Sequence, residues 1–587
     1  MIKGFLVRNE GRHGISKRRR AGLPGYGSDM GVTSNVKKTI AYLRRNGIEN
    51  TYYAARERLE TNRRHHYAYA APGREEMDRQ RIDGRNLTDA PVIAVVMPAY
   101  NTPESFLREA VESVVAQSYE HWRLIVSDAS DTDAVRNVMQ DYLSDERIKY
   151  LKLTENGGIS ANTNAGIALA LQNDGGADDG GAGDGNVNDG GADDGRRTCD
   201  YVGLLDHDDV LTPDALYHMA MAIIGEARHE MERIGLHQYD EPDAGIGQRP
   251  ADGPKRAKTD KGIGGAGPAL LYSDEDKMHR DEDSGATMYF DDHIKYKFNY
   301  DLILTNNYIC HFMLIRRDVA AKIKFRPEFD GAQDYDYVLQ VIRMLCGEEC
   351  RNGISIDRLG EEIVHVPRVL YHWRSHPGST ATNAASKDYA YEAGLRALEQ
   401  HVSIMHGRDA GAVRHGKHRG FYEIIWGHAG AKEEAGHAAK NDEAGHAAEN
   451  DEAGHATEND EAGRGARGAG AGRIYVRDLN DVFEARPDVG AVIGRNYDRH
   501  GVMIECIADE DGNWLYAGTF KHYAGRFNRF DCAQDVAFAD VRFVRTRQEL
   551  QDLLDEARNE DYVASSRRFA AELKARGYQI LYVPYEI

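Results

Sequence analysis

The alternation of strand-like and helix-like segments that starts at Pro91 is the feature that most constrains the fold of this chain. Apolar runs suited to buried strands recur, and the segments between them place apolar residues at helical spacing, as in the helix expected after Thr102-Pro103. Repeated βα units of this kind form a mainly parallel sheet that is sandwiched by helices. We therefore predict an α/β, Rossmann-like domain with strands at Val92–Met97, Trp122–Val126, Ile148–Leu153 and Tyr201–Leu205 and a helix at Ile159–Leu171.

Polar, glycine-rich segments divide the rest of the chain. Residues 173–197 and about 235–267 have few bulky apolar side chains, so burial cannot offset the entropy cost of ordering them, and we expect disordered inserts. Residues 434–463 repeat a nine-residue unit with one histidine. Histidines at that spacing point to opposite sides of a helix and cannot share an ion, which favours a flexible linker. The expected organisation is a basic arm with short helices (1–90), the α/β domain (91–425), the linker (426–472) and a small α/β unit (473–587).

Charge is distributed unevenly along the chain. The net charge is −21, yet residues 1–90 hold 19 Lys and Arg against 10 Asp and Glu. The acidic remainder would repel a polyphosphate backbone, so we expect no nucleic-acid partner for the residues after Asp89. The arm, with its runs Lys17–Arg20 and Arg63–His66, is suited to peripheral contact with an anionic membrane face; a solvated charged arm is the simpler alternative.

The cysteines and the lack of long apolar runs indicate in which cellular compartment the protein is expected. The six cysteines show no paired framework, and only Cys346 and Cys350 lie close together, which is typical of a reducing compartment. The basic N-terminus does not have the pattern of a secretory signal, and no apolar run approaches the roughly 20 residues that span a bilayer. We expect a cytoplasmic protein that is soluble or at most attached to a surface.

Polar residues follow four of the predicted strands, at the edge where a doubly wound sheet binds ligands. They are Pro98–Asn101, Ser127–Ser130, Glu155–Gly158 and Asp206–Asp209. The last run delivers three carboxylates to one edge, and such hard oxygen ligands suit Mg²⁺ or Mn²⁺ beside a substrate diphosphate. A capped loop before the helix start at Thr212-Pro213 is the alternative interpretation.

The order of these motifs is similar to that of a known enzyme family. The chain resembles the inverting glycosyltransferase family 2, whose fold is GT-A, over about Pro91 to Thr382. The resemblance rests on the segments Val95–Asn101, Ser127-Asp128, Asn156–Ser160, Leu205–Asp209, Tyr272–Lys277, Gly331–Asp336 and Tyr371–Arg374. It implies a nucleotide-sugar donor, a mixed GT-A sheet and a divalent cation, Mn²⁺ or Mg²⁺.

The resemblance also implies roles for individual residues on the donor side. Asp128 is expected to contact the nucleobase and Asp208 to hold the metal, while Asp206 lies near the ribose and Pro98, Tyr100 and Asn101 line the nucleoside pocket. The turn at Asn156 and Gly158 frees backbone N–H groups before a helix, which suits a nucleotide phosphate or ribose; a simple helix start is equally consistent with the sequence.

An inverting transfer is a single displacement and needs one base on the acceptor side. By the resemblance we choose Asp334, although Gln333 stands where many family members have Glu; Asp336 is the alternative, and a helix cap is the structural interpretation of Asp334. Arg374 could pair with the diphosphate and His372 could be a further metal ligand, with surface packing as the competing interpretation. The role of Asp274–Asp276, a rival metal cluster, stays open.

Taken together, these features predict a metal-assisted glycosyltransferase acting on a saccharide or lipid-linked saccharide in surface-polysaccharide synthesis. A nucleotidyltransferase acting on sugar phosphates is the enzyme alternative, and a non-catalytic scaffold that binds sugar nucleotides is the alternative from another class. Residues 473–587 resemble a degenerate second transferase unit that lacks its front strand.

Overall fold

The computed structural model describes residues 67–172, 199–225, 267–281, 285–346, 356–375, 388–427, 479–509, 512, 514–519, 524–559, 561–585 and 587. The short helices expected before residue 60, residues 173–197, nearly all of residues 235–267 and all but the first two residues of the repeat linker lie outside these ranges. No helix among the described residues combines the length and the apolar character needed to cross a membrane.

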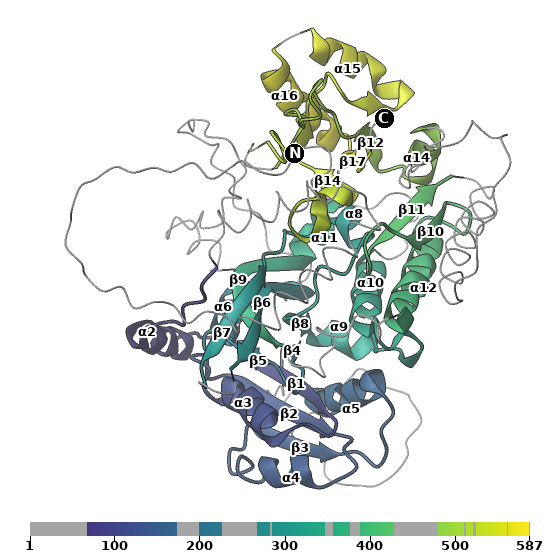
Figure 1. Cartoon of the computed structure of the whole chain (residues 1–587). Coiled ribbons are helices and arrows are strands. Elements are labelled where there is room, and N and C mark those ends of the chain that lie inside the picture. The colour runs from purple at the N-terminus through teal and green to yellow at the C-terminus, as the bar shows by residue number, and fades with distance from the viewer. Residues whose placement is uncertain are drawn as a thin grey trace, which may run out of the picture. The chain divides into compact units, whose positions relative to one another are not determined.

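A nine-stranded mixed sheet forms the centre of the domain (Figure 1). Its strands follow the order β3-β2-β1-β4-β8-β6-β9-β5, and β7 pairs with β6. Their bounds are β1 Ile93–Ala99, β2 Trp122–Asp128, β3 Ile148–Lys152, β4 Tyr201–Leu204, β5 Val210–Leu211, β6 Leu270–Arg280, β7 Thr287–His293, β8 Met313–Arg316 and β9 Ile363–Arg374.

The first half of this sheet is the predicted parallel one. β1 pairs in parallel with β2 and β4, and β2 pairs in parallel with β3. Every residue of β1 is buried, and successive residues enter two different cores: Ala94 and Val96 face one, Val95 and Met97 the other. Helix α5 (Ile159–Leu171) contributes to the first core and α3 (Glu104–Val115), α4 (Ala134–Met139) and α6 (Ala215–Ile223) to the second, so helices cover both faces.

The second half of the sheet is mixed. β8 runs antiparallel to both β4 and β6, and β5 and β7 are antiparallel as well, whereas β6 and β9 form a long parallel ladder. The sandwiched mixed sheet is thus confirmed: its first half is parallel throughout, and its second half combines antiparallel pairs with the parallel pairing of β6 and β9. The other helices and the hairpin of this region are α8 Tyr300–Ile303, α9 Arg317–Lys322, η1 Pro327–Phe329, α10 Gln333–Cys346, α11 Ile356–Glu362, α12 Asp388–Met405, β10 Gly411–His415 and β11 Tyr422–Trp426.

Residues 479–587, called the C-terminal unit below, form a smaller sheet with the order β14-β17-β12-β16 and a core of their own. They belong to the same compact unit as the rest of His65–Ile587. This agrees with the small α/β unit expected from the sequence. Its elements are α14 Leu479–Ala485, β12 Val489–Ile493, β13 Ile507–Ala508, η4 Arg526–Asp531, β14 Gln534–Val536, β15 Phe538–Ala539, β16 Arg545–Thr546, η5 Gln548–Leu550, α15 Gln551–Arg558, α16 Tyr562–Ala575 and β17 Gln579–Tyr582.

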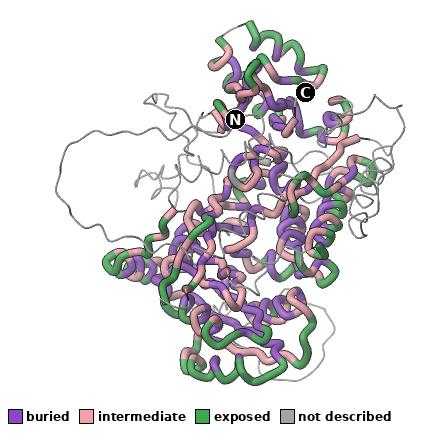
Figure 2. Tube along the Cα trace, viewed as in Figure 1, coloured by how far each residue is buried: buried purple, intermediate pink, exposed green. Residues whose placement is uncertain are grey.

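Buried residues run along the strands of the central sheet and the inner faces of its helices, and exposed residues lie on the outer helix faces (Figure 2). Helix α2 (Arg74–Arg85), which falls within the predicted arm, joins this domain: the Ser118 hydroxyl donates to Gln80 at 2.7 Å, with both side chains buried. A helix that precedes Pro91 therefore packs against the central domain.

Candidate active site

The turn between β4 and β5 presents the acidic run Asp206–Asp209. The Asp206 side chain is 49% exposed, and Asp208 is partly buried. Asp209 is buried and accepts hydrogen bonds from the Tyr371 hydroxyl at 2.5 Å and the Arg374 backbone N–H at 2.7 Å. Burial and the neighbouring carboxylates raise the pKa of Asp209 well above its ordinary value. Asp209 therefore anchors the turn, while Asp206 and Asp208 remain accessible to a ligand.

Asp128 ends β2 with a buried carboxylate that the surrounding chain already holds. It accepts from the Tyr150 hydroxyl at 2.6 Å, the Ser130 backbone N–H at 2.8 Å and the Lys152 ammonium at 3.2 Å. Burial alone would raise the pKa of Asp128, but these donors together lower it below its ordinary value. The predicted nucleobase contact is thus a fixed, ionised carboxylate at the end of a parallel strand.

Tyr100 and Asn101 lie together after β1, as expected, while Pro98 is buried within the strand. The Tyr100 hydroxyl and the Asn101 amide both donate to one oxygen of Asp131, at 3.0 and 2.9 Å. Tyr100 is 41% exposed, so this part of the site has an open aromatic face. Asp131 is a site residue that the sequence analysis missed, because it lies outside the short motif at the end of β2.

The start of α5 is occupied by the protein's own acceptors. The Asn156 side chain accepts from the Gly158 backbone N–H at 3.1 Å, and the Asp330 carboxylate accepts from the backbone N–H and the hydroxyl of Ser160. Gly158 has φ +88°, and a Cβ there would lie 2.6 Å from an Asp330 oxygen. This arrangement favours the helix-start interpretation over a phosphate site formed by free N–H groups.

Asp334 lies in the first turn of α10 and accepts a hydrogen bond from the Asn307 amide at 2.8 Å. Its side chain is partly buried. Burial raises the pKa of Asp334 above its ordinary value, with a further contribution from Asp206 and an opposing one from His311. A carboxylate with a raised pKa that is near the acidic turn has the properties of a general base. Asn307 is a second residue that the sequence analysis did not identify.

Asp336, the alternative base, is in a different environment. It is fully buried, and the Arg326 guanidinium donates to it through two nitrogens, one of them Nε at 2.8 Å. The Gln340 amide donates at 2.8 Å, and Arg343 lies 3.7 Å away. A carboxylate that is committed to two guanidinium groups cannot readily accept a substrate proton, so the structure contradicts this alternative.

The rival acidic cluster of β6 is buried and each of its carboxylates pairs with histidine. Asp274 accepts from His365 at 2.7 Å, and Asp276 lies 2.5 Å from His372 Nδ1. Glu275 lies 3.1 Å from His293 Nδ1 and 3.2 Å from His311 Nδ1, and 3.5 Å from the buried Lys295 ammonium. We call these contacts the carboxylate–histidine ladder of β6. They leave no open carboxylate face for an exchangeable Mg²⁺ or Mn²⁺ among the described residues.

Glu275, Cys310 and His311 do place three possible ligand atoms within 4.8 Å of one another. A thiol, an imidazole and one carboxylate are the ligands of a softer metal than Mg²⁺. However, burial and Glu275 raise the pKa of the Cys310 thiol well above its ordinary value, which opposes the thiolate that a metal requires. The group is better described as a hydrogen-bonded support.

His372 and Arg374, proposed from the sequence as a metal ligand and a diphosphate partner, are both held by neighbouring residues of the protein. The His372 ring lies 4.4 Å from both the Tyr69 and Tyr289 rings, and its Nδ1 is bound to Asp276. This position gives no support to its predicted role as a metal ligand. The Arg374 guanidinium is buried, 2.7 Å from Glu109 and 2.5 Å from the Asp208 carbonyl oxygen. Arg374 therefore stabilises the acidic turn and does not present a free fork to a diphosphate.

His311 is a further residue of the site that the sequence analysis did not identify. Its ring stacks on Tyr371 at 4.8 Å, and its two nitrogens lie 3.2 Å from Glu275 and 3.7 Å from Asp206. Burial lowers the pKa of His311, but the carboxylates outweigh this and raise it to about 9. The site thus has a protonated imidazole between the acidic turn and β6. Nothing in its local sequence marks it, because its partners come from distant strands.

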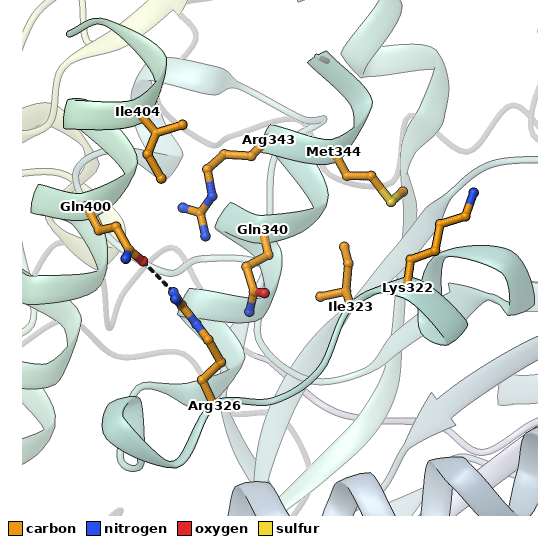
Figure 3. Close-up of a pocket in the computed structure, with 8 residues that line it drawn as sticks. All are labelled: Lys322, Ile323, Arg326, Gln340, Arg343, Met344, Gln400 and Ile404. Carbon is orange, nitrogen blue, oxygen red and sulfur yellow. Dashed lines mark hydrogen bonds between the residues drawn. The ribbon is translucent and has the colours of Figure 1, made fainter. Parts of the chain in front are cut away.

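Among the described residues, Asp206 and Asp208 fit a hard divalent cation best. Both offer carboxylate oxygens on an accessible turn, and Asp334 contributes to the same electrostatic environment. A cavity of roughly 390 Å³ lies elsewhere, between α9, α10 and α12 (Figure 3). It is lined by Lys322, Ile323, Arg326, Gln340, Arg343, Met344, Gln400 and Ile404, none of which is a predicted site residue.

Comparisons with known proteins show which parts of this chain are similar to a described family. Residues 94–173 match the model of Glycosyl transferase family 2. The chain is 32% identical over 332 residues to the uncharacterized protein y4gI of Sinorhizobium fredii, covering 56% of this chain and 27% of that protein. It is 26% identical over 320 residues to the O-antigen biosynthesis protein RfbC of Myxococcus xanthus, covering 54% and 18%. The chain thus spans about a quarter or less of the length of these relatives.

Solved structures of lower similarity are also matched. The S. aureus TarS 1-349 structure has 14% sequence identity and a TM-score of 0.30, covering 54% of this chain and 66% of that one.

Proposed function

We propose that this chain, of which residues 94–173 match the model of Glycosyl transferase family 2, transfers a sugar from a nucleotide diphosphate sugar to a saccharide or lipid-linked saccharide, by an inverting and metal-assisted reaction. The observation that supports this most directly is the group formed by Asp206, Asp208, His311 and Asp334. Asp206 and Asp208 lie on an accessible strand-end turn, the His311 ring lies 3.7 Å from Asp206, and burial and Asp206 both raise the pKa of Asp334.

In this proposal Asp334 is the base. It takes the proton of an acceptor hydroxyl while that oxygen forms a bond to the anomeric carbon and the bond from that carbon to the diphosphate breaks, its electron pair leaving with the diphosphate. Asp208 would hold Mn²⁺ or Mg²⁺, which supplies positive charge to the leaving diphosphate. Asp128, Tyr100 and Asn101 bind the nucleoside, and Asp206 lies beside its ribose.

Polysaccharide synthesis is proposed from the relatives' names. RfbC is named an O-antigen biosynthesis protein, and TuaG of Bacillus subtilis, 36% identical over 81 residues, a putative teichuronic acid biosynthesis glycosyltransferase. Cys199, Cys310, Cys506 and Cys532 are free thiols, which supports the reducing, cytoplasmic compartment expected from the sequence.

The test is release of nucleoside diphosphate from a panel of nucleotide sugars by the full chain with Mn²⁺ or Mg²⁺. We expect Asp334→Asn and Asp208→Ala each to lower kcat by about 10²-fold or more, and chelation of the metal to abolish turnover. Asp141→Ala, which removes an exposed carboxylate that pairs with Arg108, is the matched control. Unchanged turnover in both site variants would reject these assignments. Release of pyrophosphate would indicate nucleotidyl transfer, and donor binding without turnover would indicate a scaffold.

A further inference from the structure

The short helix α8 is held by a residue of the C-terminal unit. Arg486 is fully buried, and its guanidinium donates to both oxygens of Asp301, at 2.5 and 3.1 Å. The same guanidinium donates to Asp488 at 2.9 and 2.7 Å and lies 5.5 and 5.3 Å from the ring centroids of Tyr300 and Trp426. A buried, bidentate pair of this kind fixes the orientation as well as the position of α8.

Two further contacts from the C-terminal unit hold the same helix. Asn299 and Asp535 bind each other reciprocally: the Asn299 amide donates to the Asp535 carbonyl at 2.9 Å, and the Asp535 N–H donates to Asn299 at 3.1 Å. The Gln579 amide donates to Asp301 at 3.3 Å and to Asp488 at 2.6 Å. A four-residue helix cannot maintain itself in isolation. The position of α8 therefore depends on partners from the α14–β12 connection, β14 and β17.

At its other side, α8 contacts the start of α10. The Tyr335 hydroxyl donates to the Ile303 carbonyl at 2.7 Å, and the Asn307 amide donates to the Asp334 carboxylate at 2.8 Å. Ile303 is the last residue of α8, and Asn307 follows the helix closely. Tyr335 is buried. The first turn of α10, which carries Asp334, is thus fixed to the same short segment that Arg486 holds.

We infer that Arg486 is a positioning residue for Asp334, and that the C-terminal unit contributes to the active site by orienting the base through α8 and Asn307. This inference rests on the proposed function, because it assigns Asp334 the role of base. The C-terminal unit then needs no catalytic constellation of its own. We expect the C-terminal unit to affect the chemical step and not the binding of the donor. Asp128, Tyr100 and Asn101, which bind the nucleoside in the proposal, lie at the strand ends of the parallel half.

The experiment uses the full chain with Arg486→Lys, Asn307→Ala and the double variant. Lysine keeps the positive charge but cannot make the bidentate hydrogen bonds of the guanidinium to Asp301, so α8 can shift. We expect kcat to fall roughly tenfold to hundredfold with the KM for donor within about twofold of wild type. The double variant should be no slower than the slower single variant, because both act through one link. Lys417→Ala is the control: it removes a contact to Asp531 of the same unit that has no part in holding α8.

Hydrogen exchange supplies a readout that does not depend on turnover. Arg486→Lys should increase amide exchange in peptides covering α8 and the first turn of α10, and Lys417→Ala should not. Faster exchange in α8 alone, an unchanged kcat, or additive losses in the double variant would overturn the inference. A wild type without donor turnover would reject the proposed function, and the exchange pattern would still decide whether Arg486 orients the Asp334 turn. Asn299→Ala, which loosens the same helix less, replaces Arg486→Lys should that variant not fold.

Discussion

The acidic run Asp206–Asp209 and the acidic run Asp274–Asp276 have similar compositions and opposite environments. The first follows β4 on a turn, and two of its three carboxylates are accessible. The second lies within β6, where all three carboxylates are buried and paired with histidines. A carboxylate just beyond a strand can bind a ligand, whereas one inside a strand must be satisfied by the protein itself. Position relative to the strand end, and not the density of acidic residues, separates a ligand site from a structural one.

The largest expected effect tests whether the β6 run is structural. Asp274→Ala removes a buried carboxylate bound to His365 and to the Lys295 backbone N–H, and we expect a loss of about 3 kcal/mol in the free energy of unfolding. Asp208→Ala, on the accessible turn, should cost less than about 1 kcal/mol while still lowering turnover. Denaturant unfolding of both variants makes the measurement. Equal losses of stability would break the distinction between the two runs.

His311 joins the two runs, and its titration gives the next largest effect. The pKa of His311 is raised to about 9 in the folded chain, against an ordinary value of about 6.5. A raised pKa means that its contribution to stability is complete below about pH 6.5 and is lost as pH rises through 9. We expect His311→Gln to lower the unfolding free energy by roughly 2 kcal/mol at pH 6 and by much less at pH 9.5.

Thermal unfolding of the wild type and His311→Gln across this pH range measures the difference between them. A gap in Tm that is the same at both pH values would show that His311 is not a protonated bridge. Asp141→Ala is again a suitable control, because it should give a small, nearly constant gap.

The smallest effect concerns the buried member of the turn. Tyr371→Phe removes the hydroxyl that donates to Asp209 at 2.5 Å, and we expect a loss of about 1–2 kcal/mol, because a buried carboxylate loses one of its two donors. Tyr100→Phe removes a similar bond to the exposed Asp131 and should cost less than about 0.5 kcal/mol. Denaturant midpoints give both values. If the two substitutions cost the same, Asp209 would belong with the accessible carboxylates.

The parallel half of the fold could be predicted from sequence because its signals are local. The predicted helix Ile159–Leu171 has those bounds in the structure, and the predicted strand Trp122–Val126 is extended by two residues in β2. β1 is a continuous apolar run that is buried throughout, and α3 buries an apolar stripe. The placement of Asp128, Asp206 and Asp208 at strand ends followed from the same pattern.

The mixed half could not be predicted in this way. β6 contains charged residues that no local pattern assigns to a buried strand, since their partners His365 and His372 come from β9. The same long-range pairing brings His372 Nδ1 to Asp276, a contact that the local sequence around His372 does not reveal. The sequence analysis chose Asp334 and kept Asp336 as the alternative, and the Arg326 contact to Asp336, formed by tertiary packing, could not be read from the sequence.

The parallel pairing of β6 with β9 also has a consequence for the rate of folding. Its partners, such as Leu270 and Ile363, are far apart along the chain, and contacts of this kind form slowly because a long loop must close first. Until β9 arrives, the three carboxylates of β6 repel one another in water and oppose burial of the strand. The chain is therefore expected to form its local βα units early and to complete the active site only after β6 has paired with β9. Pairing of the acidic strand β6 with β9 is then the slow step of folding.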